Sequence, residues 1–237
     1  MNASESLTPP RHFFSPMIDA PIILDIGRQN SPTGTQTSLL DLGSGFPVYW
    51  QHSDLKSLQD LSAVVQSMAA YTAIVYNHCQ GIALQENKAK LADMRNSVQH
   101  RLLSLPSAEK LGTIPYPLYE ATRLAALTYS LLVIFPIHGP RAPFAELASQ
   151  LRFNLLLDLN RQKPSKHLLW ILVIGAIASL NTENRAGFIS AVRQFSFRLM
   201  IKTWEDLKDV LGCFLWLDIT NDADGVKIWE EVESLKE

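Results

Sequence analysis

The segment HLLWILVIGAIASL, residues 167–180, has no charged side chain from Leu168 to Leu180. A helix on the surface of a protein keeps one polar face, whereas a helix that is apolar all round has to be buried. A helix that crosses a membrane needs about 20 apolar residues, and this run is shorter. We therefore predict that the segment forms the central buried helix of a helical protein.

A second apolar run, Leu124–Ile137, follows a polar start in the segment YPLYEATRLAALTYSLLVIFPI, residues 116–137. Pro117 suits the first turn of a helix, and Pro136 ends one because it lacks an N–H and constrains the residue before it. The sequence predicts a helix over about 116–135. Because the run is too apolar to face water, we expect it to pack against the central helix.

Apolar residues after Ser53 recur every three or four positions, as they do in amphipathic helices. Ser53 and Thr203 suit the cap of a helix start, and Asp54, Glu205 and Asp206 suit the first turns that follow. The sequence predicts an all-α, single-domain bundle of about seven or eight helices. Besides the two apolar helices, the expected elements are a helix from Ser53 and helices over about 86–105, 141–159, 185–200, 203–217 and 225–235.

Residues 1–52 are rich in proline and glycine and carry only short apolar clusters, so we predict an irregular arm before a helical domain over 53–237. We expect the arm to pack on the body through apolar side chains, namely Phe13, Phe14, Ile22 to Leu24, Val48 and Tyr49. The first residues have neither the basic start nor the apolar stretch of a secretory signal.

The composition excludes several classes of protein. Of the 237 residues, 47% are hydrophobic and 19% charged, which is enough apolar material for a folded core. The net charge of −2 argues against non-specific binding of nucleic acid, and we expect no direct binding of nucleic acid and no membrane association. Cys79 and Cys213 lack CxxC spacing, so we expect free, buried thiols, no thiolate zinc site and an intracellular protein, cytoplasmic or nuclear.

Sequence motifs for catalysis and cofactors are missing. The six histidines form no HxxxH or HxH pair, and no GxSxG, GxGxxG or GxxxxGK[ST] motif occurs. The sequence thus predicts no metal site and no cofactor, and it identifies no catalytic residue. His138 and Arg141 follow the second apolar helix, where a surface loop is the simpler interpretation.

The segment TNDADGVKIWEE, residues 220–231, resembles a calcium-binding loop in part. Asp222, Asp224, Gly225 and Glu231 occupy four of the expected positions, but Thr220 and Lys227 do not fit the pattern. We interpret the segment as a turn that caps the last helix rather than as a calcium site.

Glu120 and Arg123 lie three residues apart, so they are neighbours on one helix face at the start of an apolar helix. One interpretation is a local ion pair that satisfies both groups. The other is a polar anchor at the edge of an apolar cavity, between this helix, the central helix and the Trp216 segment. Large aromatic side chains usually pack in a core but also line ligand pockets. The candidate ligand-binding set is Tyr119, Glu120, Arg123, Tyr129, Trp170 and Trp216.

Three phrases occur in order along the chain: PLYEATRLAALTYSLLVIFPI, LLWILVIGAIAS and LGCFLWLDITNDADGVKIWEEV. Together they resemble the C-terminal helical regulatory region of fungal-specific transcription factors of the zinc-cluster type, over about residues 55–235. Such factors carry six clustered cysteines and a basic linker before this region, and neither occurs in this sequence. The resemblance implies a helical bundle that senses or transmits a signal without reading DNA itself.

Two functions from different classes follow from the sequence. The first is a stand-alone, non-catalytic protein that binds a hydrophobic small molecule or a protein partner and is linked to secondary metabolism. The second is a cofactor-free isomerase or cyclase acting on a hydrophobic polyketide or terpenoid, which requires only shape, orientation and one or two hydrogen-bond donors.

Overall fold

A computed structural model describes residues 41–81, 87–112, 118–137, 141–155 and 162–235, and within these ranges it confirms the all-α prediction. The described residues form nine α-helices and no strand. The helices are α2 (Lys56–Cys79), α3 (Lys88–Ser104), α4 (Ala108–Leu111), α5 (Tyr119–Tyr129), α6 (Ala142–Leu155), α7 (Lys166–Ala178), α8 (Arg185–Arg198), α9 (Trp204–Gly212) and α10 (Asp218–Ser234).

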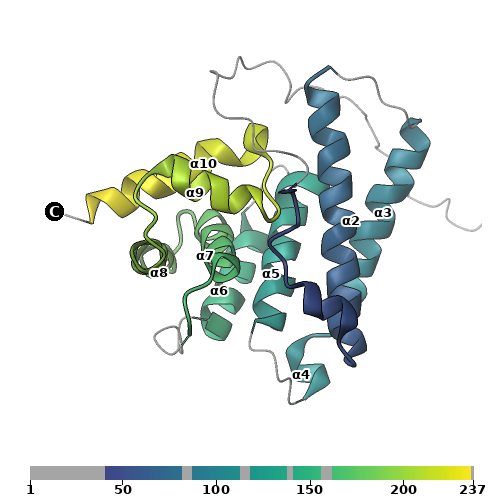
Figure 1. Cartoon of the computed structure of the whole chain (residues 1–237), viewed down its shortest axis with the longest axis horizontal. Helices are drawn as coiled ribbons and strands as arrows, with labels where there is room; N and C mark the ends of the chain where they lie inside the picture. Colours follow the sequence, from purple (N-terminus) through teal and green to yellow (C-terminus); the bar gives the residue numbers. More distant parts are fainter. Residues whose placement is uncertain (1–40, 82–86, 113–117, 138–140, 156–161, 236–237) are drawn as a thin grey trace, which may run out of the picture.

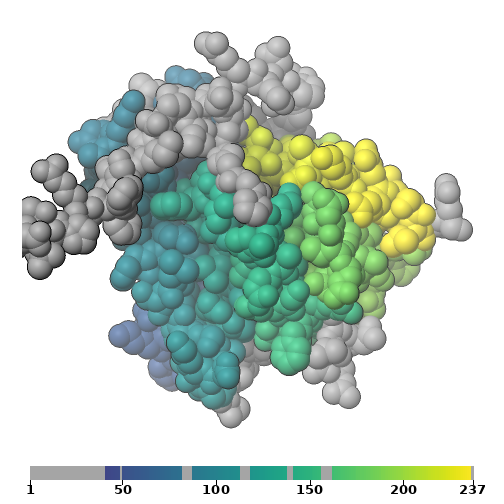
Figure 2. Space-filling view, turned by 180° about the vertical axis from the view of Figure 1, so that it is seen from behind, coloured from purple at the N-terminus to yellow at the C-terminus, as the bar shows by residue number. Residues whose placement is uncertain are grey.

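The helices form a bundle in which α5, α6 and α7 lie between two outer groups (Figure 1). The long helices α2 and α3 pack side by side on one side, whereas α8, α9 and α10 lie on the other. From behind, the blue surfaces of α2 and α3 are separated from the yellow surface of α10 by the teal and green surfaces of the middle helices (Figure 2). The buried apolar side chains form one hydrophobic core cluster.

Helix α7 is the central buried helix that the sequence predicts. Every residue from His167 to Ala178 is buried. Ser165 caps the start of the helix: its side chain accepts a hydrogen bond from the Leu168 N–H, and so one of the unpaired donors of the first turn is satisfied.

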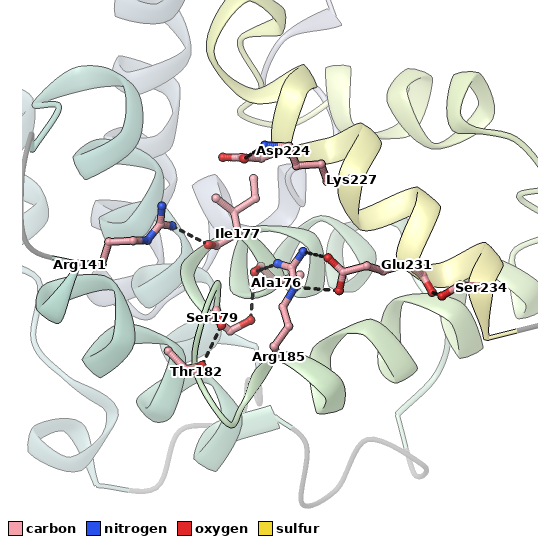
Figure 3. Close-up of polar contacts among 10 residues, drawn as sticks. All are labelled: Arg141, Ala176, Ile177, Ser179, Thr182, Arg185, Asp224, Lys227, Glu231 and Ser234. Carbon is pink, nitrogen blue, oxygen red and sulfur yellow. Dashed lines mark hydrogen bonds and ion pairs between the residues drawn. The ribbon is translucent and has the colours of Figure 1, made fainter.

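Two arginines from other elements satisfy the carbonyl groups at the end of α7 (Figure 3). Arg141 donates from Nη2 to the Ile177 carbonyl at 3.0 Å, and Arg185 donates from Nη1 to the Ala176 carbonyl. Arg185 is itself held by Glu231 of α10, through Nε to Oε2 at 3.1 Å and Nη2 to Oε1. Positive charge at a helix C-terminus also complements the helix dipole, so these contacts let α7 end inside the protein.

Helix α5 changes its type rather than continuing to residue 135 as a regular helix. Ser130–Ile134 form a π-helical turn, η4, and the Phe135 N–H donates to the Ser130 carbonyl at 2.6 Å. Pro136 explains the end of the element, because proline disfavours the helical conformation for the residue before it. Phe135 accordingly has φ −129° and ψ 63°.

The predicted helix starts and ends are partly confirmed. Thr203 caps α9 with its side chain, and Asp206 returns a bond to the Thr203 N–H, so this cap is a capping box. The cap predicted at Ser53 is wrong, because α2 begins after Leu55. The Ser53 hydroxyl instead accepts from the Leu55 N–H at 3.2 Å, a turn that competes with the helix.

The helix predicted over 203–217 is wrong beyond Gly212. The segment after α9 is not helical, because its carbonyl groups accept hydrogen bonds from other parts of the protein. The Gly45 N–H donates to the Cys213 carbonyl at 2.7 Å, and the Gly43 N–H donates to the Phe214 carbonyl at 3.1 Å. The indole N–H of Trp170 donates to the Leu215 carbonyl at 2.9 Å. Tertiary hydrogen bonds thus replace a further helical turn.

The turn predicted over residues 220–231 is also wrong, because the whole segment lies within α10. The helix begins at Asp218, and the Asn221 side chain accepts from the Leu217 N–H at 2.9 Å. Gly225 is tolerated inside the helix because the Trp204 ring occupies the space that a Cβ would take. The glycine that suggested a loop therefore serves helix packing.

Only the last part of the predicted N-terminal arm falls within the described residues, since 1–40 lie outside them. The short 3₁₀-helix η3 (Val48–His52) lies there. Phe46 and Trp50 are buried in the core, whereas Val48 is exposed, so the predicted packing through Val48 is wrong. The described part of the arm is attached by these two rings and by the N–H groups of Gly43 and Gly45, which bind the segment after α9.

Gly175 provides a test of how closely α7 packs. The Phe188 ring of α8 occupies the space that a Cβ at residue 175 would need, and the ring is fully buried. We expect Gly175→Ala to lower the free energy of unfolding by about 1–3 kcal/mol, although alanine is the better helix former. Urea unfolding followed by circular dichroism measures the change. In the double variant with Phe188→Leu the two losses should not add, and simple additivity would contradict this packing.

Candidate functional site

Glu120 and Arg123 form the local ion pair that the sequence offered as one interpretation. Arg123 donates from Nε to Glu120 Oε2 at 3.0 Å and from Nη2 to Oε1, and each side chain is 12% exposed. Glu120 Oε2 also accepts from the Ala108 N–H at 2.9 Å. The pair thus fixes the turn between α3 and α4 against the start of α5.

The hydroxyl groups of both candidate tyrosines have partners inside the protein. Tyr119 donates to the Pro106 carbonyl at 2.9 Å, next to the ion pair. Burial raises the pKa of Tyr119 to about 12, although the charge of Arg123 lowers it. Tyr129 lies at the other end of α5, with its hydroxyl 3.1 Å from the Thr72 hydroxyl of α2, and burial raises its pKa as well.

Trp170 belongs to a buried aromatic cluster that we call the His167 cluster, formed by Phe46, Trp50, His167, Trp170 and Phe214. The Phe214 ring stacks on His167 and Trp170, with centroid distances of 5.6 and 5.9 Å. The Phe46 ring contacts the rings of His167, Trp170 and Phe214 edge-on, with centroid distances of 5.2–5.4 Å. The cluster joins α7 to the N-terminal segment and to the segment after α9.

The hydrogen bonds of His167 fix its tautomer. The Thr122 hydroxyl uses its only hydrogen on the Leu118 carbonyl, at 2.6 Å. It can therefore only accept from His167 Nε2, which lies 3.0 Å away, and so Nε2 carries the proton. Burial lowers the pKa of His167 to about 3, so the ring is neutral at physiological pH.

Trp216 lies in a different place, beside an ionic group at the start of α10. Its indole N–H donates to Asp222 Oδ1 at 2.8 Å, and its ring lies 6.3 Å from that of Trp204. Lys208 bridges Asp218 and Asp222, at 3.2 and 2.6 Å. Burial lowers the pKa of Lys208, but its bonds to the two carboxylates outweigh this and raise the pKa.

The structure brings together three of the six candidate residues, Tyr119, Glu120 and Arg123. Tyr129, Trp170 and Trp216 make separate contacts, and the polar group of each candidate has a partner within the protein. The proposed ligand-binding role of the set stays a prediction. Arg141 contacts the end of α7, and His138 lies outside the described residues.

The metal-binding side chains, the thiols and the apolar helices of the described ranges complete the description. No group of three or more His, Cys, Asp and Glu side chains that could hold a metal ion occurs there. Cys79 and Cys213 are free thiols that are partly rather than fully buried, and burial raises the pKa of both. None of the described helices is long and apolar enough to cross a membrane.

The sequence reasoning missed a surface feature at the end of α8, which we call the α8 patch. It is formed by Arg193, Phe197 and Arg198 of the helix and by Met200, which lies two residues after its end. All four side chains are exposed, Phe197 by 80% and Met200 by 72%. The described residues place no carboxylate in an ion pair with either arginine. The sequence does contain a signal, because Phe197 is out of phase with the buried Phe188, Val192 and Phe195.

Comparisons with known proteins leave the family open: no family model, no curated protein and no solved structure matches this chain. The functional argument therefore depends on the arrangement of the residues.

The ion pair predicts a stability effect at Arg123. In Arg123→Met, Glu120 keeps its hydrogen bond from the Ala108 N–H but loses its charged partner. The carboxylate is largely shielded from solvent, so its charge is left without compensation. We expect the free energy of unfolding to fall by about 1–3 kcal/mol. The double variant Glu120→Gln/Arg123→Met should recover part of the loss, because no uncompensated charge is left. Equal stability of single variant and parent in urea unfolding would show that the pair is not structural.

His167 predicts a pH dependence. The unfolded chain binds a proton at His167 below its ordinary pKa of 6.5, whereas the folded protein does so only near 3. This group therefore lowers the free energy of unfolding as the pH falls below 6.5, with a slope approaching about 1.4 kcal/mol per pH unit. His167→Gln keeps a donor for Thr122 without the titration, so its stability should depend less on pH between 6.5 and 4. Parallel curves for both proteins would contradict the assignment.

Proposed function

We propose that this chain is a non-catalytic regulatory module that binds a segment of a partner protein on the α8 patch. The sequence resemblance to the helical regulatory region of fungal-specific transcription factors supports a role in transmitting a signal, linked to secondary metabolism. The internal hydrogen bonds of the six candidate residues also favour an outer surface over an interior pocket. The polar groups that would orient an interior ligand already have partners.

The single observation that carries the proposal is the exposure of Phe197, on a helix that is otherwise firmly packed, and of Met200 just after the end of that helix. Phe188, Ile189, Val192 and Phe195 bury one face of α8 in the core. Large exposed apolar side chains next to polar ones are characteristic of interaction surfaces, and aromatic residues with arginine dominate binding energy there. The α8 patch has this composition.

Charge indicates the kind of partner. Arg193 and Arg198 flank Phe197, and the next charged residue along the chain, Lys202, is also basic and exposed. An acidic, amphipathic helix would place its apolar side chains on Phe197 and Met200 and its carboxylates on the arginines. We therefore propose an acidic helical segment as the partner.

A labelled synthetic amphipathic helix of Glu and Leu tests the proposal by fluorescence anisotropy. Phe197→Ser should weaken binding by about tenfold or more, since truncating a central aromatic anchor commonly costs over 1 kcal/mol. Arg193→Glu should also weaken peptide binding, and the loss of affinity relative to the parent should be larger at low salt than at high salt. Phe153 of α6, which is 74% exposed, is the matched control, and Phe153→Ser should bind as the parent does.

Equal effects of the two serine substitutions would show that the peptide binds to exposed aromatic side chains without selectivity, and would reject the α8 patch. The alternative from the sequence, a cofactor-free isomerase or cyclase, is tested on the same preparation. Conversion of a hydrophobic polyketide or terpenoid by the parent protein would favour that alternative over a non-catalytic module.

A further inference from the structure

Arg95 of α3 is a partly buried cation with no acidic partner among the described residues. Its guanidinium carbon lies 4.5 Å from the centroid of the Phe135 ring. Its Nε is buried and has no hydrogen-bond partner there. Within the described ranges, no carboxylate therefore balances the positive charge, and its neighbour is the face of an aromatic ring.

Two other arginines with little exposure each have a carboxylate partner, which Arg95 lacks among the described residues. Arg123 and Arg185 are 12% and 14% exposed, and each makes two bonds to a glutamate. A charge withdrawn from water is costly unless an opposite charge and hydrogen bonds compensate for it. Arg95 departs from this pattern, which points to an anion that binds from outside.

The surroundings of Arg95 combine apolar surface with polar groups. The π-helical turn η4 leads into Phe135 and Ile137, which are 38% and 40% exposed. Met94, next to Arg95 in sequence, is partly buried against the core. Burial raises the pKa of Tyr71 on α2 while the charge of Arg95 lowers it, so the phenol lies within electrostatic reach of the guanidinium.

The π-helical turn is held in place relative to Arg95. The Ser130 hydroxyl donates to Gln99 Oε1, and Gln99 lies one helical turn after Arg95 on the same face of α3. The Ile137 N–H donates to the Leu131 carbonyl at 3.1 Å, which holds the chain after Phe135 against the turn. Single π-helical turns occur frequently at functional sites, where they redirect side chains.

We propose that this site, formed by Arg95, Phe135 and Ile137, binds a small amphipathic carboxylate such as the anion of a fatty acid. Nε of Arg95 is buried, but the N–H groups on its two terminal nitrogens can donate to the two oxygens of a carboxylate. The acyl chain covers the exposed parts of Phe135 and Ile137. The site lies on α3 and on the residues that follow η4, separate from the α8 patch, and does not depend on the proposed partner.

Isothermal titration with dodecanoate and with dodecanol, both below their aggregation concentrations, tests the proposal. We expect the parent protein to bind dodecanoate at least about tenfold more tightly than dodecanol, since a hydrogen-bonded charge pair contributes that much or more. Arg95→Met keeps the length of the side chain without the charge and should abolish this difference. Arg101→Met, on the exposed side of the same helix, is the matched control and should preserve it.

Dodecanoate binding that is equal in Arg95→Met and Arg101→Met would overturn the proposal, as would no preference for dodecanoate over dodecanol in the parent protein. Circular dichroism and the thermal midpoint establish that the variants are folded. If Arg95→Met does not fold, Arg95→Glu and Phe135→Ala take its place, and unchanged binding in either one overturns the proposal. Phe197→Ser should leave dodecanoate binding intact, so this site and the α8 patch can fail separately.

Discussion

A helix that is apolar on every side can be stable only if other elements surround it, and α7 imposes this requirement on the rest of the described chain. Its side chains need apolar neighbours all round, and the polar groups at its ends need partners inside the protein. The structure meets the second need with Ser165 at the start and with Arg141 and Arg185 at the end. Glu231 then holds Arg185, so the last helix of the bundle also depends on how α7 ends.

The parts of the fold that could be predicted from sequence are those in which local pattern and tertiary environment agree. The run from Leu168 to Ala178 contains no polar face, so its burial follows from its composition. The cap at Thr203 is likewise a local signal, because both partners of the capping box lie within four residues. Neither prediction requires knowledge of a distant contact.

The predictions that are wrong concern segments whose structure depends on contacts with residues far away in sequence. Residues 213–217 continue the helical pattern, yet carbonyl groups there bind Gly43, Gly45 and Trp170, which lie far away in sequence. Gly225 suggested a loop, whereas its missing side chain makes room for Trp204. In both cases a tertiary contact outweighs a local preference of about 1 kcal/mol or less per residue.

The same distinction explains which candidate site residues sequence reasoning could find. Glu120 and Arg123 are visible as a pair because they are three residues apart on one helix, and for that reason they neutralise each other. Arg95 and Phe135 are 40 residues apart, and their contact exists only after α3 packs against η4. An arginine that is already paired with a carboxylate on its own helix is neutralised and binds an anionic ligand less well. Arg95 and the two arginines of the α8 patch have no carboxylate partner among the described residues, which leaves their charges available for recognition.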